Sequence, residues 1–240
     1  MNLARLKAEV AEAHIEIHRA GLVTLSFGNV SGVDRDSSVL LIKPSGIPCD
    51  AVTADDIVSV SLDEGRLVDG RLNPSTDTPT HRHLYRELPE IGAVIHTHSA
   101  HATAWAQAGR PIPALGTTHA DFFRGPVPVT RALLDAEIAG EYEWQTGVVI
   151  VDTLRELGRS PVDCPAILVS SHGPFVWGAT PAAAVATAIA LESIAAMALE
   201  TLAIEPAAAA VSSALMDRHN DRKHGPAAYY GQRPVDRDHT

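Results

Sequence analysis

The chain has 240 residues, of which 45% are hydrophobic and 20% are charged, the balance of an ordinary globular protein. Its formal net charge of −10 argues against nucleic-acid binding through the phosphate backbone, because that binding depends on Lys and Arg. The two cysteines, Cys49 and Cys164, lie far apart without CxxC spacing, which indicates a reduced, cytoplasmic protein without a disulfide framework or a thiolate zinc site.

In the first half of the chain, apolar residues at steps of three and four predict an amphipathic helix over residues 3–17, ended by Gly21. Strands are expected over residues 22–34, 39–43 and 57–62, with a close backbone approach at Gly28. The loop at 73–79 leads into a helix that runs to about residue 88. A short buried strand over residues 93–95 and a helix over residues 100–108 follow.

In the second half, residues 111–128 are rich in Pro, Gly and Thr and predict a long irregular connection of the kind that often carries function. A helix at 147–157, strands at 166–169 and 175–177, and a last helix at 212–223 are expected. The Ala-rich segment 181–204 carries Glu192 and Glu200, so we interpret it as a buried helix and not as a membrane span. Helices and strands are mixed without a linker between them, which predicts one α/β domain with a largely antiparallel or mixed sheet.

The candidate metal ligands are histidines at the ends of buried strands. Because side chains at i and i+2 of a strand share a face, His96 and His98 project together, and two imidazoles in this position suit one divalent cation such as zinc. His172, in a loop bounded by Gly173, offers the third nitrogen of an open zinc site. The alternative for all of them is a set of hydrogen-bonded histidines without a metal. Most of the twelve histidines have no site role, and His14, His18, His81, His83 and His239 are assigned to helices or the surface.

A second group of polar residues predicts an anion pocket. Asp77 either caps the helix that follows it or reaches the metal as a carboxylate ligand. Beside it, Ser75 and Thr76 offer hydroxyl and N–H groups at a helix N-terminus. Two further loops offer donors of the same type, and these are Gly28-Asn29 and Ser45-Gly46, the latter next to Lys43. Three such loops together favour a phosphate-binding pocket.

Two residues are candidates for proton transfer. Asp121 lies in the Thr-rich connection before two phenylalanines, and this apolar flank predicts a raised pKa that would suit an acid or base. Its alternative role is a loop Asp that bonds to its own backbone. Tyr230 is a candidate acid or base near the C-terminus, and its alternative role is packing.

At these residues the sequence resembles the class II aldolase/adducin family, and within it the pentulose-phosphate 4-epimerases. The resemblance runs from Leu3 to about Gln232. It is carried by Gly28-Asn29-Val30-Ser31, Lys43-Pro44-Ser45-Gly46, Ser75-Thr76-Asp77-Thr78-Pro79, His96-Thr97-His98-Ser99, Thr117-Thr118-His119-Ala120-Asp121, Gly140-Glu141-Tyr142-Glu143-Trp144, Ser171-His172-Gly173-Pro174 and Tyr229-Tyr230-Gly231. One departure is Ser75-Thr76 where Ser-Ser is usual, and Thr keeps the hydroxyl.

The resemblance implies a three-layer α/β/α sandwich over residues 1–232. The tail at 233–240 extends past the family's typical end, has no assigned role and is expected to be flexible. It implies zinc, with manganese or cobalt as alternatives that imidazole also accepts, and a homotetramer with active sites between subunits. The implied metal ligands are His96, His98 and His172, with Asp77 as a fourth. The implied phosphate-binding residues are Gly28, Asn29, Lys43, Ser45, Gly46, Ser75 and Thr76. The implied acid–base pair is Asp121 and Tyr230, with Tyr230 from a neighbouring subunit and Thr117, Glu143, His219 and Arg222 in support.

The implied activity interconverts L-ribulose 5-phosphate and D-xylulose 5-phosphate in the cytoplasm, a step of L-arabinose catabolism. The C3–C4 bond breaks in a retro-aldol step, the aldehyde fragment rotates, and the fragments rejoin, with zinc as the Lewis acid. Alternatives are a related pentulose-phosphate epimerase, an aldolase of the same family and a noncatalytic scaffold. Aldolases that resemble this chain carry Glu at the place of Asp77, and a scaffold has no need of three histidine ligands.

Overall fold

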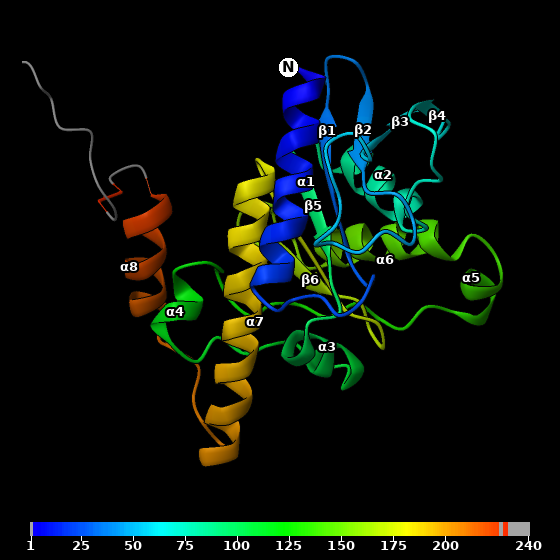
Figure 1. Ribbon diagram of the computed structural model, residues 1–240. Coiled ribbons are helices and arrows are strands. Elements are labelled where there is room, and N and C mark those ends of the chain that lie inside the picture. Colours follow the sequence, from blue (N-terminus) through cyan, green and yellow to red (C-terminus); the bar gives the residue numbers. More distant parts are fainter. Residues whose placement is uncertain (1, 226–227, 230–240) are drawn as a thin grey trace, which may run out of the picture.

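The computed structural model describes residues 2–225 and 228–229, and it contains a seven-stranded sheet with helices on both faces (Figure 1). The strands are β1 (Asn29–Asp34), β2 (Val39–Ile42), β3 (Val58–Ser61), β4 (Leu67–Asp69), β5 (Ala93–His96), β6 (Ala166–Leu168) and β7 (Pro174–Gly178). The helices are α1 (Leu3–Arg19), α2 (Thr78–Glu87), α3 (Ala100–Gln107), α4 (Thr117–Ala120), α5 (Asp135–Ala139), α6 (Tyr142–Glu156), α7 (Pro181–Ile204) and α8 (Ser213–His224).

The sheet has the order β4-β3-β2-β1-β5-β7-β6, and all neighbouring strands pair antiparallel. Side chains alternate between two apolar cores: Ile95 and Leu41 pack with α1, α3 and α7 on one face, while Val94 and Leu40 pack with α2 and α6 on the other. Because both faces are covered, the inner strands are continuous apolar runs. The predicted three-layer α/β/α sandwich with a mostly antiparallel sheet is confirmed.

Helix α7 is the central helix of one layer and packs against α1, α3 and the strands β5 and β7. By length and by a mean hydropathy of 1.9 it is apolar enough to cross a membrane, but half of that window is buried inside the protein. These contacts agree with the predicted core helix.

Several boundaries differ from those expected from the sequence. Gly21 ends α1 with a φ of +72°, as predicted, but the strand after it begins at Asn29 and not at residue 22. Helix α6 begins at Tyr142, five residues before the predicted start at Gly147. The short elements β4, α4 and α5 were not predicted.

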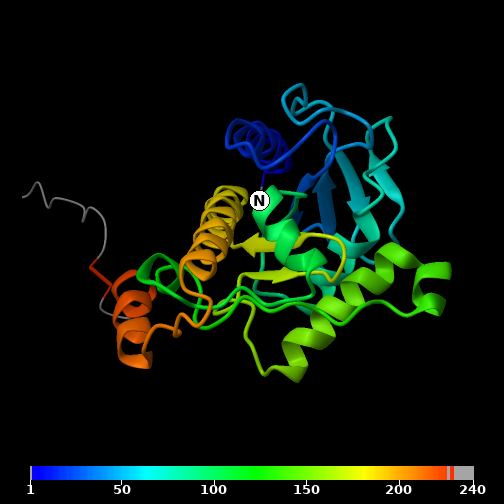
Figure 2. The same cartoon turned by 90° about the horizontal axis from the view of Figure 1, so that it is seen from below.

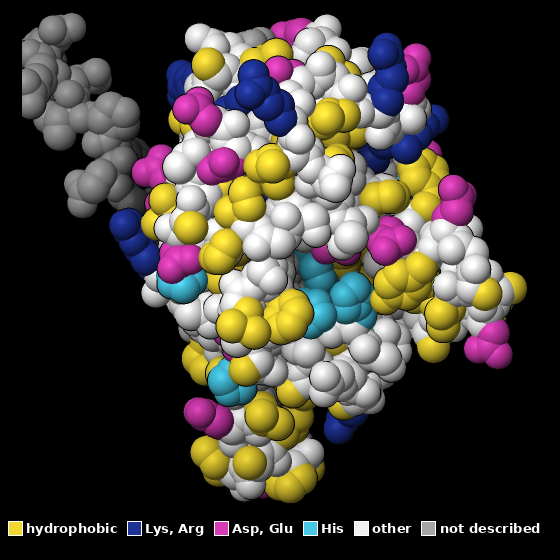
Figure 3. All heavy atoms as spheres, turned by 45° about the vertical axis from the view of Figure 1, so that its right-hand side comes forward, with side chains coloured by type: hydrophobic (Ala, Val, Ile, Leu, Met, Phe, Trp, Pro, Cys, Tyr) yellow, Lys and Arg dark blue, Asp and Glu magenta, His cyan; other side chains and the backbone are white. Residues whose placement is uncertain are grey.

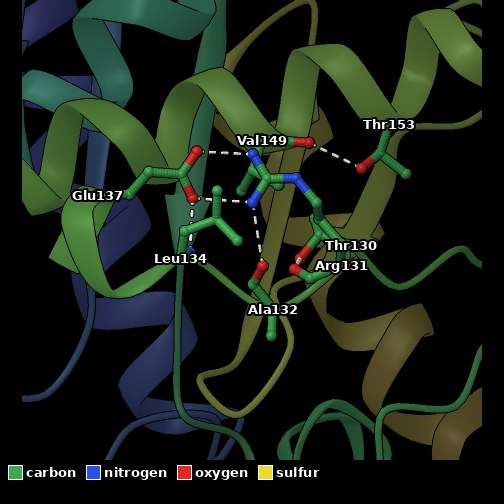
Figure 4. A network of polar contacts seen from close by, with 7 residues as sticks. All are labelled: Thr130, Arg131, Ala132, Leu134, Glu137, Val149 and Thr153. Atoms are coloured by element: carbon green, nitrogen blue, oxygen red, sulfur yellow. Dashed lines mark hydrogen bonds and ion pairs between the residues drawn. The ribbon is translucent and has the colours of Figure 1, made fainter.

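Helix α5 has no buried residue, so polar contacts hold it in place. The Arg131 guanidinium donates to both carboxylate oxygens of Glu137 at 2.7 and 2.8 Å, and Glu137 also accepts from the backbone N–H of Leu134 (Figure 4). Such a helix has no hydrophobic stripe from which a sequence pattern would reveal it.

Helices α4 and α8 pack on each other and stand off from the sheet, on the side away from α5 and α6 (Figures 1 and 2). A small apolar cluster of Ala114, Ala120 and Met216 joins them. The predicted domain end at residue 232, the tail 233–240 and Tyr230 all lie outside the described residues.

Candidate metal centre and substrate cavity

The register of the central strands brings the predicted metal ligands together. Strand β5 lies between β1 and β7, which places Asn29 on one side of His96 and Phe175 on the other. His98 follows two residues after His96, and His172 sits in the tight turn between β6 and β7. In that turn Ser171 has a φ of +60° and the N–H of His172 bonds to the carbonyl of Val169.

The three imidazoles form a nearly regular triangle, with ring centroids 4.7 to 5.0 Å apart. Each ring offers a nitrogen that lies within 4.8 Å of the other two, and Nε2 of His96 lies 3.1 Å from Nε2 of His98. Two nitrogens that bind one zinc ion at about 2.0–2.1 Å with tetrahedral angles are separated by about 3.3 Å. The spacing therefore fits one cation, and histidine side chains gather in a hollow of the face shown in Figure 3.

Outer contacts decide which nitrogens face the cation. His96 is buried, stacks on Phe175 at 4.2 Å between ring centroids, and donates its Nδ1–H to the carbonyl of Pro174 at 2.9 Å. This leaves its Nε2 for a metal. The hydroxyl of Tyr142, on the first turn of α6, lies 3.4 Å from Nδ1 of His172 and leaves Nε2 of that ring for the metal in the same way.

Burial favours the neutral form of the His98 and His172 imidazoles, which is the form that binds metals. It lowers the pKa of His172 to about 4, with the neighbouring rings of His96 and His98 adding to the effect. Burial also lowers the pKa of His98, although this side chain is the most exposed of the three.

Asp77 precedes α2, but its side chain makes no capping bond to that helix. Instead one carboxylate oxygen accepts from the Asn29 side chain at 2.6 Å. Burial raises the pKa of Asp77, but His96, His81 and the Asn29 hydrogen bond outweigh it, so the pKa is lower than usual. Asp77 lines the same cavity as the histidines without belonging to the tight group of ligand atoms.

The predicted anion-binding residues line one cavity of about 270 Å³ together with the three histidines and Asp77. They are Gly28, Asn29, Lys43, Ser45, Gly46, Ser75 and Thr76. Lys43 is buried and donates its ammonium to the carbonyls of Ile47 and Pro44. Gly28 has a φ of +106°, and a side chain there would meet the carbonyl oxygen of His96 at 2.9 Å, so this loop requires glycine.

Asp121 lies elsewhere, in the α4–α8 unit, and does not line this cavity. The Arg222 guanidinium binds both of its carboxylate oxygens at 2.6 and 3.0 Å, and Nδ1 of His219 lies 3.0 Å from one of them. Burial raises the pKa of Asp121, but these hydrogen bonds and the charge of Lys223 outweigh it, and the pKa is lowered. The predicted increase in pKa from the phenylalanine flank is therefore wrong.

Two other predicted site residues lie in the same elements as residues already described. Thr117 is the first residue of α4, in the same unit as Asp121, and Glu143 follows Tyr142 in the first turn of α6. Sequence reasoning missed Tyr142 as a partner of the metal ligands. The available signal was its place in the motif 140–144 next to Glu143.

The family model described as "Class II Aldolase and Adducin N-terminal domain" matches residues 8–199. The chain belongs to this family. A protein of Salmonella paratyphi B, named L-ribulose-5-phosphate 4-epimerase UlaF, is 50% identical over 231 residues, which cover 96% of this chain and 100% of that protein. The protein of the same name from Salmonella typhi is 49% identical, again over 96% of this chain and 100% of that protein.

Solved structures share the fold of this class II aldolase family member. An L-fuculose 1-phosphate aldolase superposes with a TM-score of 0.76 at 22% identity, covering 91% of this chain and 95% of that one. The YgbL protein of Klebsiella pneumoniae, named as a putative aldolase/epimerase/decarboxylase, superposes with a TM-score of 0.70 at 24% identity. The superposition covers 92% of this chain and 100% of that one.

Proposed function

We propose that the chain is a zinc-dependent epimerase that interconverts L-ribulose 5-phosphate and D-xylulose 5-phosphate. The observation that carries this proposal is that one cavity of about 270 Å³ combines three converging imidazoles with a group of anion-binding donors. A sugar phosphate matches both halves, because its sugar oxygens bind a cation and its phosphate binds N–H, hydroxyl and ammonium donors. The names of relatives at 49–50% identity support the epimerase within the family.

His96, His98 and His172 would hold the cation, with Asp77 as a fourth ligand. Their imidazole nitrogens, two of them on rings oriented by Pro174 and Tyr142, fit zinc, and manganese or cobalt would fit the same donors. The bound cation would supply Lewis-acid stabilisation of the negative charge that develops as the C3–C4 bond opens.

The rest of the cavity would hold and orient the substrate. The Lys43 ammonium and the Ser45-Gly46 and Ser75-Thr76 loops would bind the phosphate, with Gly28 allowing close approach. Asn29 donates to Ser75 and Asp77, and its Oδ1 is buried with no partner in the described part of the chain. A buried acceptor left over in this way would take a hydrogen bond from a sugar hydroxyl.

Asp121 and Tyr230 would move the protons on opposite faces of the substrate. One takes the proton of the C4 hydroxyl as the C3–C4 bond breaks, and the other returns a proton after the aldehyde has turned and been re-added. Asp121 does not line the cavity of its own chain, so it would enter the cavity of a neighbouring subunit of a tetramer, with Thr117, His219 and Arg222 behind it and with Glu143 at the receiving site. Tyr230, which lies outside the described residues, would also come from a neighbouring subunit.

The deciding experiment incubates the zinc-loaded protein with L-ribulose 5-phosphate and identifies the products. We expect D-xylulose 5-phosphate without free fragments. Release of glycolaldehyde phosphate and dihydroxyacetone would instead identify an aldolase, and no turnover with tight zinc binding would contradict both enzymes. We place the reaction in the cytoplasm, because both cysteines are free and buried, as in a reducing compartment. We place it in the breakdown of pentoses such as L-arabinose, because the proposed substrate is a pentulose phosphate.

A further inference from the structure

Glu192 is an acidic residue in the apolar helix α7, and its side chain is 17% exposed. One carboxylate oxygen accepts from the backbone N–H and from Nδ1 of His101, each at 2.8 Å, and the other accepts from the N–H of Ala102 at 3.0 Å. The hydroxyl of Ser99 also bonds to this carboxylate. All these donors belong to the start of α3.

Helix α3 needs this external partner. The first N–H groups of any helix lack acceptors within it, and Ser99, in the N-cap position, makes no side-chain capping bond to α3 in the described structure. Glu192 supplies the missing acceptors from a different helix, and its negative charge also suits the positive end of α3. A carboxylate in the middle of α7 is thus explained by the cap it provides.

Helix α3 connects the two segments that carry the metal ligands. Its first turn directly follows His98. Near its other end, the carbonyl of Ala106 accepts the N–H of Ser171, the residue before His172. A side chain at Gly173 would meet the carbonyl of Thr97 at 2.8 Å and the Thr103 hydroxyl at 3.5 Å, which shows how closely the His172 turn lies against this helix.

We propose that Glu192 is a positioning residue of the metal centre, which fixes α3 and through it the mutual placement of His98 and His172. The inference rests on the metal centre of the proposed function. The indole N–H of Trp105 donates to the carbonyl of Ala195 at 3.0 Å, so α3 keeps a second attachment to α7 when Glu192 is replaced. Loss of Glu192 therefore loosens the ligand geometry more than it undoes the fold.

The test measures zinc affinity of the metal-stripped full chain by competition with a chromophoric chelator. We expect Glu192→Gln, which has nearly the same shape but only one acceptor oxygen, to bind zinc about tenfold more weakly, the lower end of the effect of outer partners on metal affinity. Glu192→Asp keeps the negative charge but has a side chain shorter by one methylene. Its zinc affinity should lie between those of the unmodified chain and Glu192→Gln. Glu200→Gln, an exposed site on the same helix, is the matched control and should bind as the unmodified chain does.

Amide hydrogen exchange on the metal-free proteins provides the second measurement. Glu192→Gln should speed exchange at the start of α3 and in the turn at 170–173, while α2 and α6 exchange as before. Unchanged zinc affinity of both Glu192 variants, or faster exchange confined to α3, would overturn the inference and leave a simple helix cap. If the unmodified chain itself binds no zinc, both the proposed function and this inference fail. If the unmodified chain binds zinc and the Glu192 variants bind it equally well, only this inference fails.

Discussion

His98 allows the metal centre to be tested at a single residue, because it is exposed while His96 is buried. We expect His98→Asn to lose zinc binding and epimerase activity together, since it removes one of three nitrogen donors without opening a cavity in the core. The measurement is the zinc content after dialysis alongside turnover. His18→Asn, on the exposed face of α1, is the control. A His98→Asn protein that keeps both metal and activity would show that the ligand assignment is wrong.

The convergence of the three candidate metal ligands was predictable in part from local rules. The two-residue period of an extended segment predicts that His96 and His98 share a side, and their rings do lie together although β5 ends at His96. A histidine in a glycine-bounded turn after a buried strand made His172 a candidate, and the loops predicted to bind an anion, which line the same cavity, each carry their own turn chemistry.

Residues whose role depends on distant partners were not predictable. The ion pair of Asp121 with Arg222 joins positions 101 residues apart, and no local pattern indicates it. The hydroxyl of Tyr142 meets His172 across 30 residues. His81, assigned from the sequence to a helix or the surface, is fully buried beneath the site, where its Nδ1 bonds to the Ser31 hydroxyl.

At the scale of elements, segments with a strong apolar period were predicted and segments without one were not. Helices α1, α2, α3, α6, α7 and α8 and six of the strands follow the expected pattern with shifts at their ends. Strand β4 is exposed at the edge of the sheet, and α5 is held by Arg131 and Glu137, so neither buries a periodic face. Their existence depends on tertiary contacts that a single sequence does not display.

Helix α1 is joined to strand β1 by a buried histidine that makes the fold sensitive to acid. His14 bonds through Nδ1 to the carbonyl of Val10 and accepts the N–H of Val30 at 2.8 Å, and burial lowers its pKa from 6.5 to about 3. Between about pH 6.5 and 3, His14 is therefore protonated in the unfolded chain but stays neutral in the folded chain. His14 thus reduces the free energy of unfolding by about 1.4 kcal/mol per pH unit as the pH falls from about 6.5 towards 3.

We expect His14→Gln to remove this part of the pH dependence, because an amide can both accept from Val30 and donate to Val10 without titrating. The measurement is urea unfolding of the metal-free protein at about pH 7, 6 and 5. His18→Gln, on the exposed side of the same helix, should leave the slope near that of the unmodified chain. If the free energy of unfolding of His14→Gln depends on pH as steeply as that of the unmodified chain, His14 is not held neutral in the folded protein.

The whole molecule carries its two groups of predicted site residues on separate units. The metal and anion residues line a cavity at the central sheet, while Asp121, His219 and Arg222 belong to the α4–α8 unit that stands off from it (Figures 1 and 2). The last turns of α7, next to this unit, expose apolar residues, with Met197 at 41%, Leu199 at 49% and Ile204 at 86%. The proposed tetramer would cover some of these exposed apolar side chains, because apolar surface is commonly buried where copies of a chain assemble.

Mixing two inactive variants tests whether sites are shared between subunits. Alone, Asp121→Asn should keep zinc and slow epimerisation by about 10²–10⁴-fold, the usual contribution of a positioned acid or base, while His98→Asn should lack metal. If each site takes its histidines from one subunit and Asp121 from the next, random mixing in equal amounts gives about a quarter of the sites an intact pair, so activity should return to about a quarter of the unmodified level. The mixture must be unfolded and refolded together so that subunits exchange, and each variant refolded alone is the control. Activity no greater than the sum of the two controls would mean that Asp121 serves the cavity of its own chain or none, and that the tetrameric arrangement of the site is wrong.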